Sequence, residues 1–339
     1  MARIATLTAL LALLVAAAPA EAVRTAGNWS LHAQRIAVGE RLISNLPDGG
    51  FHGERALTGG QLREVRDALA RRMGRAPVSL RTSNGKVTVA QFHSVLARQL
   101  GFSDDARRVQ QETARAGLRP PARFGAEVVV RLIELTHAQH MPWNEKLSLY
   151  PWSPVTRAEV AWSLYQVAIL PPKELAFTHD VLALYALPRY TPAQKRILRR
   201  AVARIGMPFI WGGVSDRAGG KQAKGGYDCS GFIWRVWKHS GLKASKKIRA
   251  RTAAGMAGEI PMRARVHRQD IQPGDLLFFG ERGTADAQFR MKSTPKNIHH
   301  SGIAMSRDFG ISATYQGVDV QPIFDEWFYD DFAWARRVL

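Results

Sequence analysis

The sequence predicts a two-part protein whose C-terminal part has an α+β fold. The chain has 339 residues, which is more than a typical single domain contains. Residues 24–185 alternate apolar helical stripes with short joints rich in glycine and proline, so this part should be mainly helical. The remainder combines helical stripes with short apolar runs that are typical of buried strands.

A secretory signal peptide is predicted at the start of the chain and is assigned residues 1–22. Arg3 supplies the positive start, Leu10 to Val15 the apolar centre, and Ala18-Pro19-Ala20 a small-residue cleavage site. The apolar run is too short to span a bilayer comfortably, and no later stretch qualifies as a transmembrane segment. We therefore expect an exported, soluble product that is secreted or held in the cell wall.

The formal net charge of +20 indicates an anionic partner. The sequence contains no aromatic-rich RNA motif, zinc-ligand spacing or recognition-helix pattern, which disfavours nucleic acid. Together with an export signal, the charge favours anionic wall polymers or a membrane surface. Arginine supplies most of the charge, so genomic base composition is an alternative explanation.

The helical part contains three segments that begin a helix in the same way. Thr58, Thr88 and Thr156 are each predicted N-caps, and a Gln or Glu three residues later completes a capping box. An apolar stripe follows each of them. The shared pattern at irregular spacing predicts a decayed repeat rather than a regular solenoid.

The third segment, Thr156-Arg157-Ala158-Glu159, resembles the S-layer homology repeat. In that family such a helix belongs to a three-repeat module that holds anionic secondary wall polymers. The resemblance implies a wall-binding module over residues 23–185, with Arg157 as the charge that faces the ligand, since guanidinium suits carboxylate or phosphate. The other two segments lack this arginine. Because capping boxes are common, ordinary helix initiation is the alternative.

Three histidines lie in this part of the chain. His137 and His140 have an i, i+3 spacing that could share a metal, and His93 lies further upstream. No carboxylate or cysteine completes a site nearby in the sequence, so we expect solvent-facing histidines and no metal site.

The C-terminal part is organised around Cys229, the only cysteine in the chain. Asp228 is a good N-cap and Gly241 a good stop, and apolar residues recur between them at helical spacing. Cys229 should therefore occupy the first turn of a helix, where free N–H groups and the macrodipole favour a thiolate. An inert, buried cysteine is the alternative.

Four motifs occur in order around this cysteine: Gly206-Met207-Pro208-Phe209-Ile210-Trp211-Gly212-Gly213, Asp228-Cys229-Ser230-Gly231, Pro273-Gly274-Asp275-Leu276-Leu277-Phe278-Phe279 and His300-Ser301-Gly302-Ile303. Together they resemble the NlpC family of papain-like cell-wall endopeptidases. The resemblance covers about residues 190–339, and we assign the domain to residues 186–339. It implies a papain-like α+β fold in which helices pack on an antiparallel sheet.

The second catalytic candidate is His300. A strand is predicted over 299–305, and strand alternation places His300 on the same face as Gly302 and Ala304. A histidine among small residues suits a cleft, which favours His300 over His299 as the base, and the family register agrees.

The resemblance implies hydrolysis of peptidoglycan stem peptides between D-glutamate and the third residue, often diaminopimelate. Cys229 would attack the carbonyl carbon, and His300 would accept the thiol proton or hold the thiolate as an ion pair, then protonate the leaving amine. Backbone N–H groups at the helix start would hold the oxyanion. No metal or organic cofactor is required.

Two positions depart from the family pattern. The family has His, Asn or Gln about a dozen residues after the catalytic histidine, and Ser312 stands there in this chain, with Thr314 and Gln316 as alternatives. A tyrosine of the family is replaced by Phe209. A catalytically weak or inactive peptidoglycan-binding protein is therefore a second hypothesis, and an acyltransferase or amidase a third.

The substrate groove is expected to involve Trp211, Asp228, Ser230 and Arg251. Two positively charged loops, 215–226 and 281–297, flank the expected cleft. We predict that they contact an anionic substrate or limit access to it, and a solvated loop is the alternative.

Overall fold

The computed structural model describes residues 29–81, 83–137, 145–219, 222, 224–280, 294–323 and 331–339. The predicted signal peptide, His140 and most of the second charged loop lie outside the described residues. Within the described ranges, no helix is both long and apolar enough to cross a membrane.

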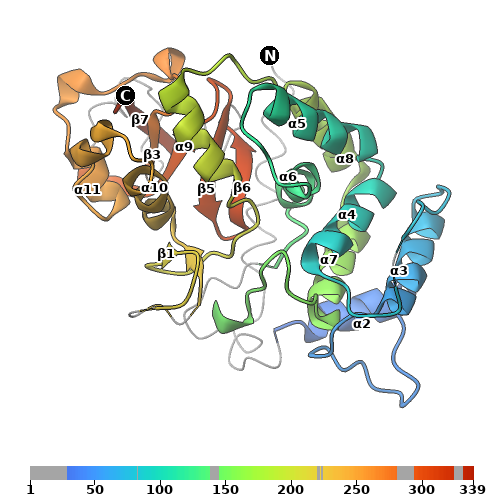
Figure 1. The fold of residues 1–339 in the computed structure, drawn as a ribbon. Coiled ribbons are helices and arrows are strands. Elements are labelled where there is room, and N and C mark those ends of the chain that lie inside the picture. The colour runs from blue at the N-terminus through green and yellow to red at the C-terminus, as the bar shows by residue number, and fades with distance from the viewer. Residues whose placement is uncertain are drawn as a thin grey trace.

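The N-terminal half is helical, as the apolar stripes predict (Figure 1). Thr58 and Thr88 form complete capping boxes, and the Thr156 side chain accepts a hydrogen bond from the Glu159 N–H. All three threonines therefore begin a helix at the predicted positions. The elements are α2 (Leu31–Gly39), α3 (Gly59–Arg72), α4 (Val89–Gln99), α5 (Ser103–Arg115), α6 (Phe124–Leu132), η1 (Glu145–Leu147), α7 (Arg157–Ile169) and α8 (Pro172–Ala183).

The three capped helices meet at their N-termini. The residues that precede the caps form a closed ring of backbone hydrogen bonds: Leu57 N–H donates to the Val155 carbonyl (2.8 Å), Val155 to Val87 (2.8 Å) and Val87 to Leu57 (2.9 Å). All three side chains are buried. Segments that are unevenly spaced in the sequence therefore occupy equivalent places around one centre, as expected for a decayed repeat.

The C-terminal half packs helices against an antiparallel sheet, which confirms the predicted α+β class (Figure 1). The five-stranded sheet has the order β6-β5-β4-β3-β7, and β1 pairs with β2 separately. The strands are β1 (Val214–Ser215), β2 (Gly226–Tyr227), β3 (Leu276–Gly280), β4 (Ile298–Ala304), β5 (Phe309–Thr314), β6 (Gly317–Pro322) and β7 (Phe332–Arg336). The helices are α9 (Pro192–Val202), α10 (Cys229–Lys238), α11 (Ala253–Gly258) and the 3-10 turns η2 (Lys243–Lys247), η3 (Met262–Ala264), η4 (Arg268–Asp270) and η5 (Pro295–Asn297).

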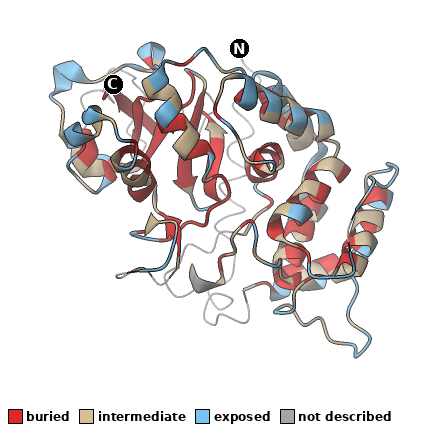
Figure 2. Cartoon of the chain, in the orientation of Figure 1, coloured by how far each residue is buried: buried red, intermediate tan, exposed pale blue. Residues whose placement is uncertain are grey.

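Both faces of the sheet are covered, which explains why β3 is apolar throughout. Leu276 and Phe278 belong to the main core, whereas Leu277 and Phe279 belong to a second cluster on the opposite face. The red strands in Figure 2 show this two-sided burial. Helix α10 packs on the main-core side against β4 and β5.

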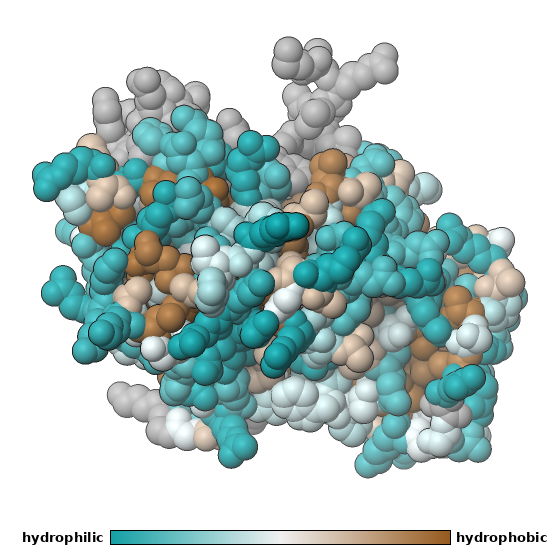
Figure 3. Space-filling view, turned by 45° about the horizontal axis from the view of Figure 1, so that its top comes forward, coloured by the Kyte–Doolittle hydropathy of each residue, from teal (hydrophilic) through white to brown (hydrophobic). Residues whose placement is uncertain are grey.

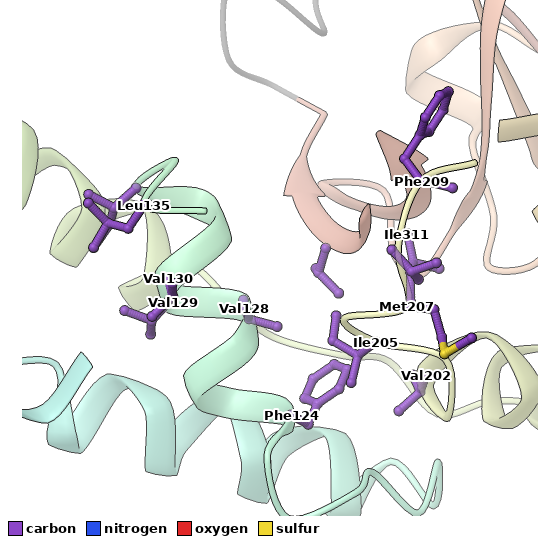
Figure 4. Close-up of a cluster of buried hydrophobic side chains, with 14 of the residues drawn as sticks. Phe124, Val128, Val129, Val130, Leu135, Val202, Ile205, Met207, Phe209 and Ile311 are labelled. Atoms are coloured by element: carbon purple, nitrogen blue, oxygen red, sulfur yellow. The ribbon is translucent and has the colours of Figure 1, made fainter. Parts of the chain in front are cut away.

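The main core continues from one half of the chain into the other. Figure 4 shows Phe124 and Val128 of α6 approaching Val202, the last residue of α9, and Ile205, which lies just after that helix. Arg123 also donates to the Ile205 carbonyl at 3.0 Å. The helical half is therefore packed directly against the half that carries Cys229.

Candidate active site

Cys229 is the first residue of α10, as predicted. The Asp228 carboxylate caps the helix and accepts hydrogen bonds from Gly231 N–H (2.5 Å) and Ser230 Oγ (2.9 Å). The apolar side of the helix is fully buried, so the sulfur is anchored to a rigid element. Cys229 as a whole residue is only partly exposed.

A glycine turn lies tightly against the start of this helix. Asp228 N–H donates to the Gly213 carbonyl at 3.1 Å, and a Cβ on Gly231 would lie 1.8 Å from that oxygen. Only glycine fits at Gly231, which explains the Asp-Cys-Ser-Gly sequence physically. Trp211, on the same turn, is 72% exposed, and its backbone N–H donates to a Glu145 carboxylate oxygen at 2.5 Å.

His300 enters the site beside an irregularity in β4. Phe279 pairs with His300, but the next residue, Gly280, pairs with Ile298, so His299 is an extra residue in the ladder. Such bulges redirect neighbouring side chains. His299 is exposed, whereas His300 stacks obliquely on Phe279 with ring centroids 5.6 Å apart. The bulge thus gives the two adjacent histidines different environments.

Ser312 is the polar neighbour of the imidazole among the three alternatives. Its Oγ lies 3.3 Å from His300 Nε2. Thr314 instead donates to the Asp319 carboxylate at 3.0 Å, and Gln316 contacts Thr136 of the helical half. The strand register therefore places Ser312, rather than Thr314 or Gln316, at the imidazole.

The thiol and the imidazole belong to adjoining elements. Ser301, the residue after His300, lowers the pKa of the Cys229 thiol. Helix α10 and strand β4 are packed together, so the fold brings together two elements whose residues Cys229 and His300 are 71 positions apart in the sequence.

Burial sets the charge state of both groups. Desolvation raises the pKa of Cys229 to about 11, and the Asp228 charge adds to this, against the lowering contacts from Ser301 and Ser230. Desolvation also lowers the pKa of His300 to about 3, with a contribution from His299. The helix start is predicted to favour a thiolate, but in this structure the lost hydration outweighs it. Burial therefore favours the neutral form of both side chains.

The other predicted groove residues lie around the helix cap. Arg251 lies over the Trp234 ring at 4.9 Å, and its pKa is lowered by burial and raised by the Asp228 charge. Ser230 is buried and its hydroxyl is directed to Asp228, so it supports the cap. The Asp228 charge thus acts on both the Cys229 thiol and the Arg251 guanidinium.

Arg157 lies far from a ligand-facing position. It is 1% exposed, its Nε donates to the Phe51 carbonyl at 2.8 Å, and an Nη donates to the Ser44 carbonyl at 2.6 Å. The expectation of a ligand-facing guanidinium is corrected, because these carbonyls and the Phe51 ring occupy it inside the helical half.

His93 is likewise not solvent-facing. It is buried, and its Nδ1 lies 3.1 Å from the fully buried Glu127 carboxylate, which also pairs with Arg131. Sequence reasoning missed this network because its members lie on different helices, α4 and α6. Among the described residues, no group of histidine, cysteine and acidic side chains could hold a metal ion.

The fold and the site define an α+β domain with a thiol and an imidazole on adjoining elements. Residues 206–337 match the model of the NlpC/P60 family. Two curated relatives are similar to this chain: murein DD-endopeptidase MepH of Escherichia coli (27% identity over 151 residues, 43% of this chain and 46% of the relative) and gamma-D-glutamyl-L-lysine dipeptidyl-peptidase of Bacillus cereus (24% over 152 residues, 44% and 38%). The matches therefore span less than half of each relative.

Two solved structures are also similar. An NlpC/P60 family protein from Bacillus cereus has a TM-score of 0.32 at 23% identity, covering 45% of this chain and 42% of its own. A lipoprotein-like NLP/P60 family protein from Staphylococcus aureus has a TM-score of 0.32 at 15% identity, covering 93% and 95%. The family match and the curated relatives support an NlpC/P60 domain in the C-terminal half, and they suggest a peptidase.

Proposed function

We propose that this protein is an exported cysteine endopeptidase that cleaves peptidoglycan stem peptides at the D-glutamyl–diaminopimelate bond. The observation that carries the proposal is the packing of α10, which begins at Cys229, against β4, which carries His300, whose imidazole meets Ser312. The similarity to the two curated relatives, a murein endopeptidase and a gamma-D-glutamyl-L-lysine peptidase, supports this substrate class.

The mechanism starts from a neutral pair. His300 accepts the thiol proton while the sulfur attacks the carbonyl carbon, so a free thiolate never accumulates. The tetrahedral oxyanion is held by backbone N–H groups at the start of α10. The imidazolium then protonates the leaving amine, and water clears the thioester. Arg251 lies beside the cap of the same helix and can hold a substrate carboxylate.

The test is digestion of a defined muropeptide followed by mass spectrometry. Cys229→Ala should abolish cleavage, and His300→Gln should reduce it by about 100-fold or more. His299→Gln is the matched control, because the exposed neighbour should be dispensable. Cleavage that survives Cys229→Ala, or that depends on His299 rather than His300, would refute the proposed mechanism.

A binding protein without activity is the rival function. Phe209 has no hydroxyl, and it packs against the Tyr315 ring at 5.3 Å. The high thiol pKa also favours an unreactive cysteine. Retention of intact muropeptide by wild type and Cys229→Ala alike, with no product in either, would favour this rival.

We further propose that the protein binds anionic wall polymers, through α9 rather than through Arg157. Lys195, Arg196, Arg199 and Arg200 line an open groove with a volume of about 640 Å³ along this helix. None of the four has an ion pair with a carboxylate among the described residues. The pairs 195/199 and 196/200 are like charges at i, i+4, and each destabilises a helix by about 0.2–0.5 kcal/mol. Hydrophilic residues dominate the face shown in Figure 3.

An anionic polymer would relieve that repulsion, and arginine suits phosphate groups. Binding of the full chain to purified cell walls should fall in the variant K195Q/R196Q/R200Q. The control R71Q/R75Q/R81Q removes the same charge from the helical half, where the three arginines are exposed. Equal losses in both variants would indicate a nonspecific charge effect and refute a site on α9.

The helical half is proposed to contribute to anchoring through its three-repeat arrangement, as the resemblance implies. The ring that joins residues 57, 87 and 155 supports this proposal. If the full chain carrying Cys229→Ala failed to sediment with purified walls at low salt, anchoring would be refuted.

A further inference from the structure

We propose that Asp319 is a positioning residue for His300 and acts through the hydroxyl of Ser312. The inference rests on the proposed peptidase function. It adds a residue that none of the four sequence motifs contains, and it explains how a serine can replace the usual orienting side chain.

The three residues occupy neighbouring strands. Gly302 of β4 pairs with Ser312 of β5, and Ser312 pairs with Asp319 of β6. Directly opposed residues of an antiparallel pair share a face, with Cβ atoms about 4.5–5.5 Å apart. Ser312 Oγ already lies 3.3 Å from His300 Nε2. The serine therefore stands between the imidazole and the carboxylate.

One oxygen of the Asp319 carboxylate needs a donor. The residue is fully buried, and its Oδ2 accepts hydrogen bonds from Thr314 Oγ1 (3.0 Å) and Gln321 Nε2 (2.9 Å). In the described part of the chain, Oδ1 has no hydrogen-bond partner. A buried oxygen without a donor destabilises the folded state, because it has lost its hydration without a replacement. The opposed Ser312 hydroxyl can supply the missing hydrogen by rotation of its side chain.

This arrangement fixes which way the Ser312 hydroxyl donates its hydrogen bond. A hydroxyl can donate or accept, so Ser312 alone cannot select one tautomer of His300. If Asp319 takes the hydroxyl hydrogen, the Ser312 oxygen remains an acceptor for His300 Nε2–H. The Nδ1 atom then carries no proton and can accept the one that leaves the Cys229 thiol. No proton has to move to Asp319 during the reaction.

The charge on Asp319 depends on its surroundings. Burial raises the pKa of Asp319 to about 7, Glu134 acts in the same direction, and the contacts of Thr314, Arg131 and Gln321 lower it. Arg131 and Glu134 come from the helical half, and His300 is linked to this face of the sheet through its contact with Ser312. The carboxylate is therefore an acceptor above about pH 7 and becomes neutral below it.

The principal test compares wild type with Asp319→Asn. The Thr314 and Gln321 donors favour the amide oxygen at the Oδ2 position, which turns the amide NH₂ toward Ser312 and reverses the hydrogen-bond direction. We expect kcat/KM on the muropeptide to fall by about 10- to 100-fold, the usual effect of losing an outer positioning group. The rise of kcat/KM with pH near 7 should disappear.

A rescue experiment separates positioning from stability. Ser312→His places an imidazole directly at His300, as in the family pattern, so adding Asp319→Asn to it should change kcat/KM by less than about 2-fold. Asp275→Asn is the matched control, since Asp275 is also buried but is held by Arg337 and by the Gln272 N–H. Equal losses from Asp319→Asn in both backgrounds would overturn the proposal.

A second measurement does not need activity. In ¹⁵N-histidine-labelled protein, assigned with His300→Gln, the His300 ring should be the Nε2–H tautomer in wild type and shift toward Nδ1–H in Asp319→Asn. An unchanged tautomer refutes the role of Asp319. A shifted tautomer in a protein that cleaves no muropeptide would keep the positioning role and refute only the peptidase function.

Discussion

Asp228→Asn should make the Cys229 thiol more acidic and more reactive. Asn caps a helix about as well as Asp, so α10 should keep its start while the negative charge is removed. That charge is one of the two causes that raise the thiol pKa.

The expected magnitude follows from the geometry of neighbouring residues. Two unit charges roughly 5 Å apart interact by about 3 kcal/mol at an effective dielectric of about 20. The hydrogen bonds from Gly231 and Ser230 already offset part of the Asp228 charge. We therefore expect the thiol pKa to fall by about one unit, worth about 1.4 kcal/mol, which gives about tenfold more thiolate at neutral pH.

The assay is the pH dependence of alkylation by iodoacetamide. Because Cys229 is the only cysteine, the rate reports one thiol. Asp216→Asn is the matched control, since Asp216 is held by Arg204 and Arg235. Circular dichroism would verify that both variants keep their helices. A thiol pKa that is unchanged or higher in Asp228→Asn would refute the electrostatic argument.

Three further predictions concern Trp211, Arg157 and Glu127. Trp211→Ala should raise KM for the muropeptide and change the unfolding free energy by less than about 0.5 kcal/mol, because the ring is 72% exposed; a large loss of stability in urea would contradict this. Arg157→Ala should lower the unfolding free energy by about 2–4 kcal/mol, since the Phe51 and Ser44 carbonyls lose a charged donor, while wall sedimentation of the folded protein stays unchanged; weaker sedimentation with normal stability would restore a ligand role. The pKa of Glu127 is about 2, below its ordinary 4.5, despite the opposing effect of burial, because Arg131 and His93 hold the charge. Its contribution to stability is therefore complete above pH 4.5 and lost as the pH falls toward 2; urea unfolding should show this loss in wild type and not in Glu127→Gln.

Local features of the fold were predictable from the sequence because they depend on neighbouring residues. The threonine caps, the helix that begins at Cys229 and the buried strand after Asp275 all follow from propensity and periodicity. The bulge at His299 was not predictable, because it arises from the pairing of β4 with β3. The motif nevertheless indicated His300 over His299, and the structure gives these residues different environments.

The ring of hydrogen bonds among residues 57, 87 and 155 is likewise only partly predictable from the sequence. The sequence indicated three similar helix starts but not that they meet, since the long, uneven connections between them carry no such signal. The helix predicted at Arg157 is confirmed. The predicted direction of the Arg157 side chain was wrong, because the carbonyls that bind it come from residues 44 and 51, which are remote in sequence.

The sequence alone determined where the helices begin and which residue types could perform thiol chemistry, because both properties depend on residues that are close together in the chain. Only the tertiary structure decided the charge on those groups. Cys229, His300 and Asp319 lose their hydration to elements that are remote in sequence, and this loss moves each pKa toward the neutral form of the group.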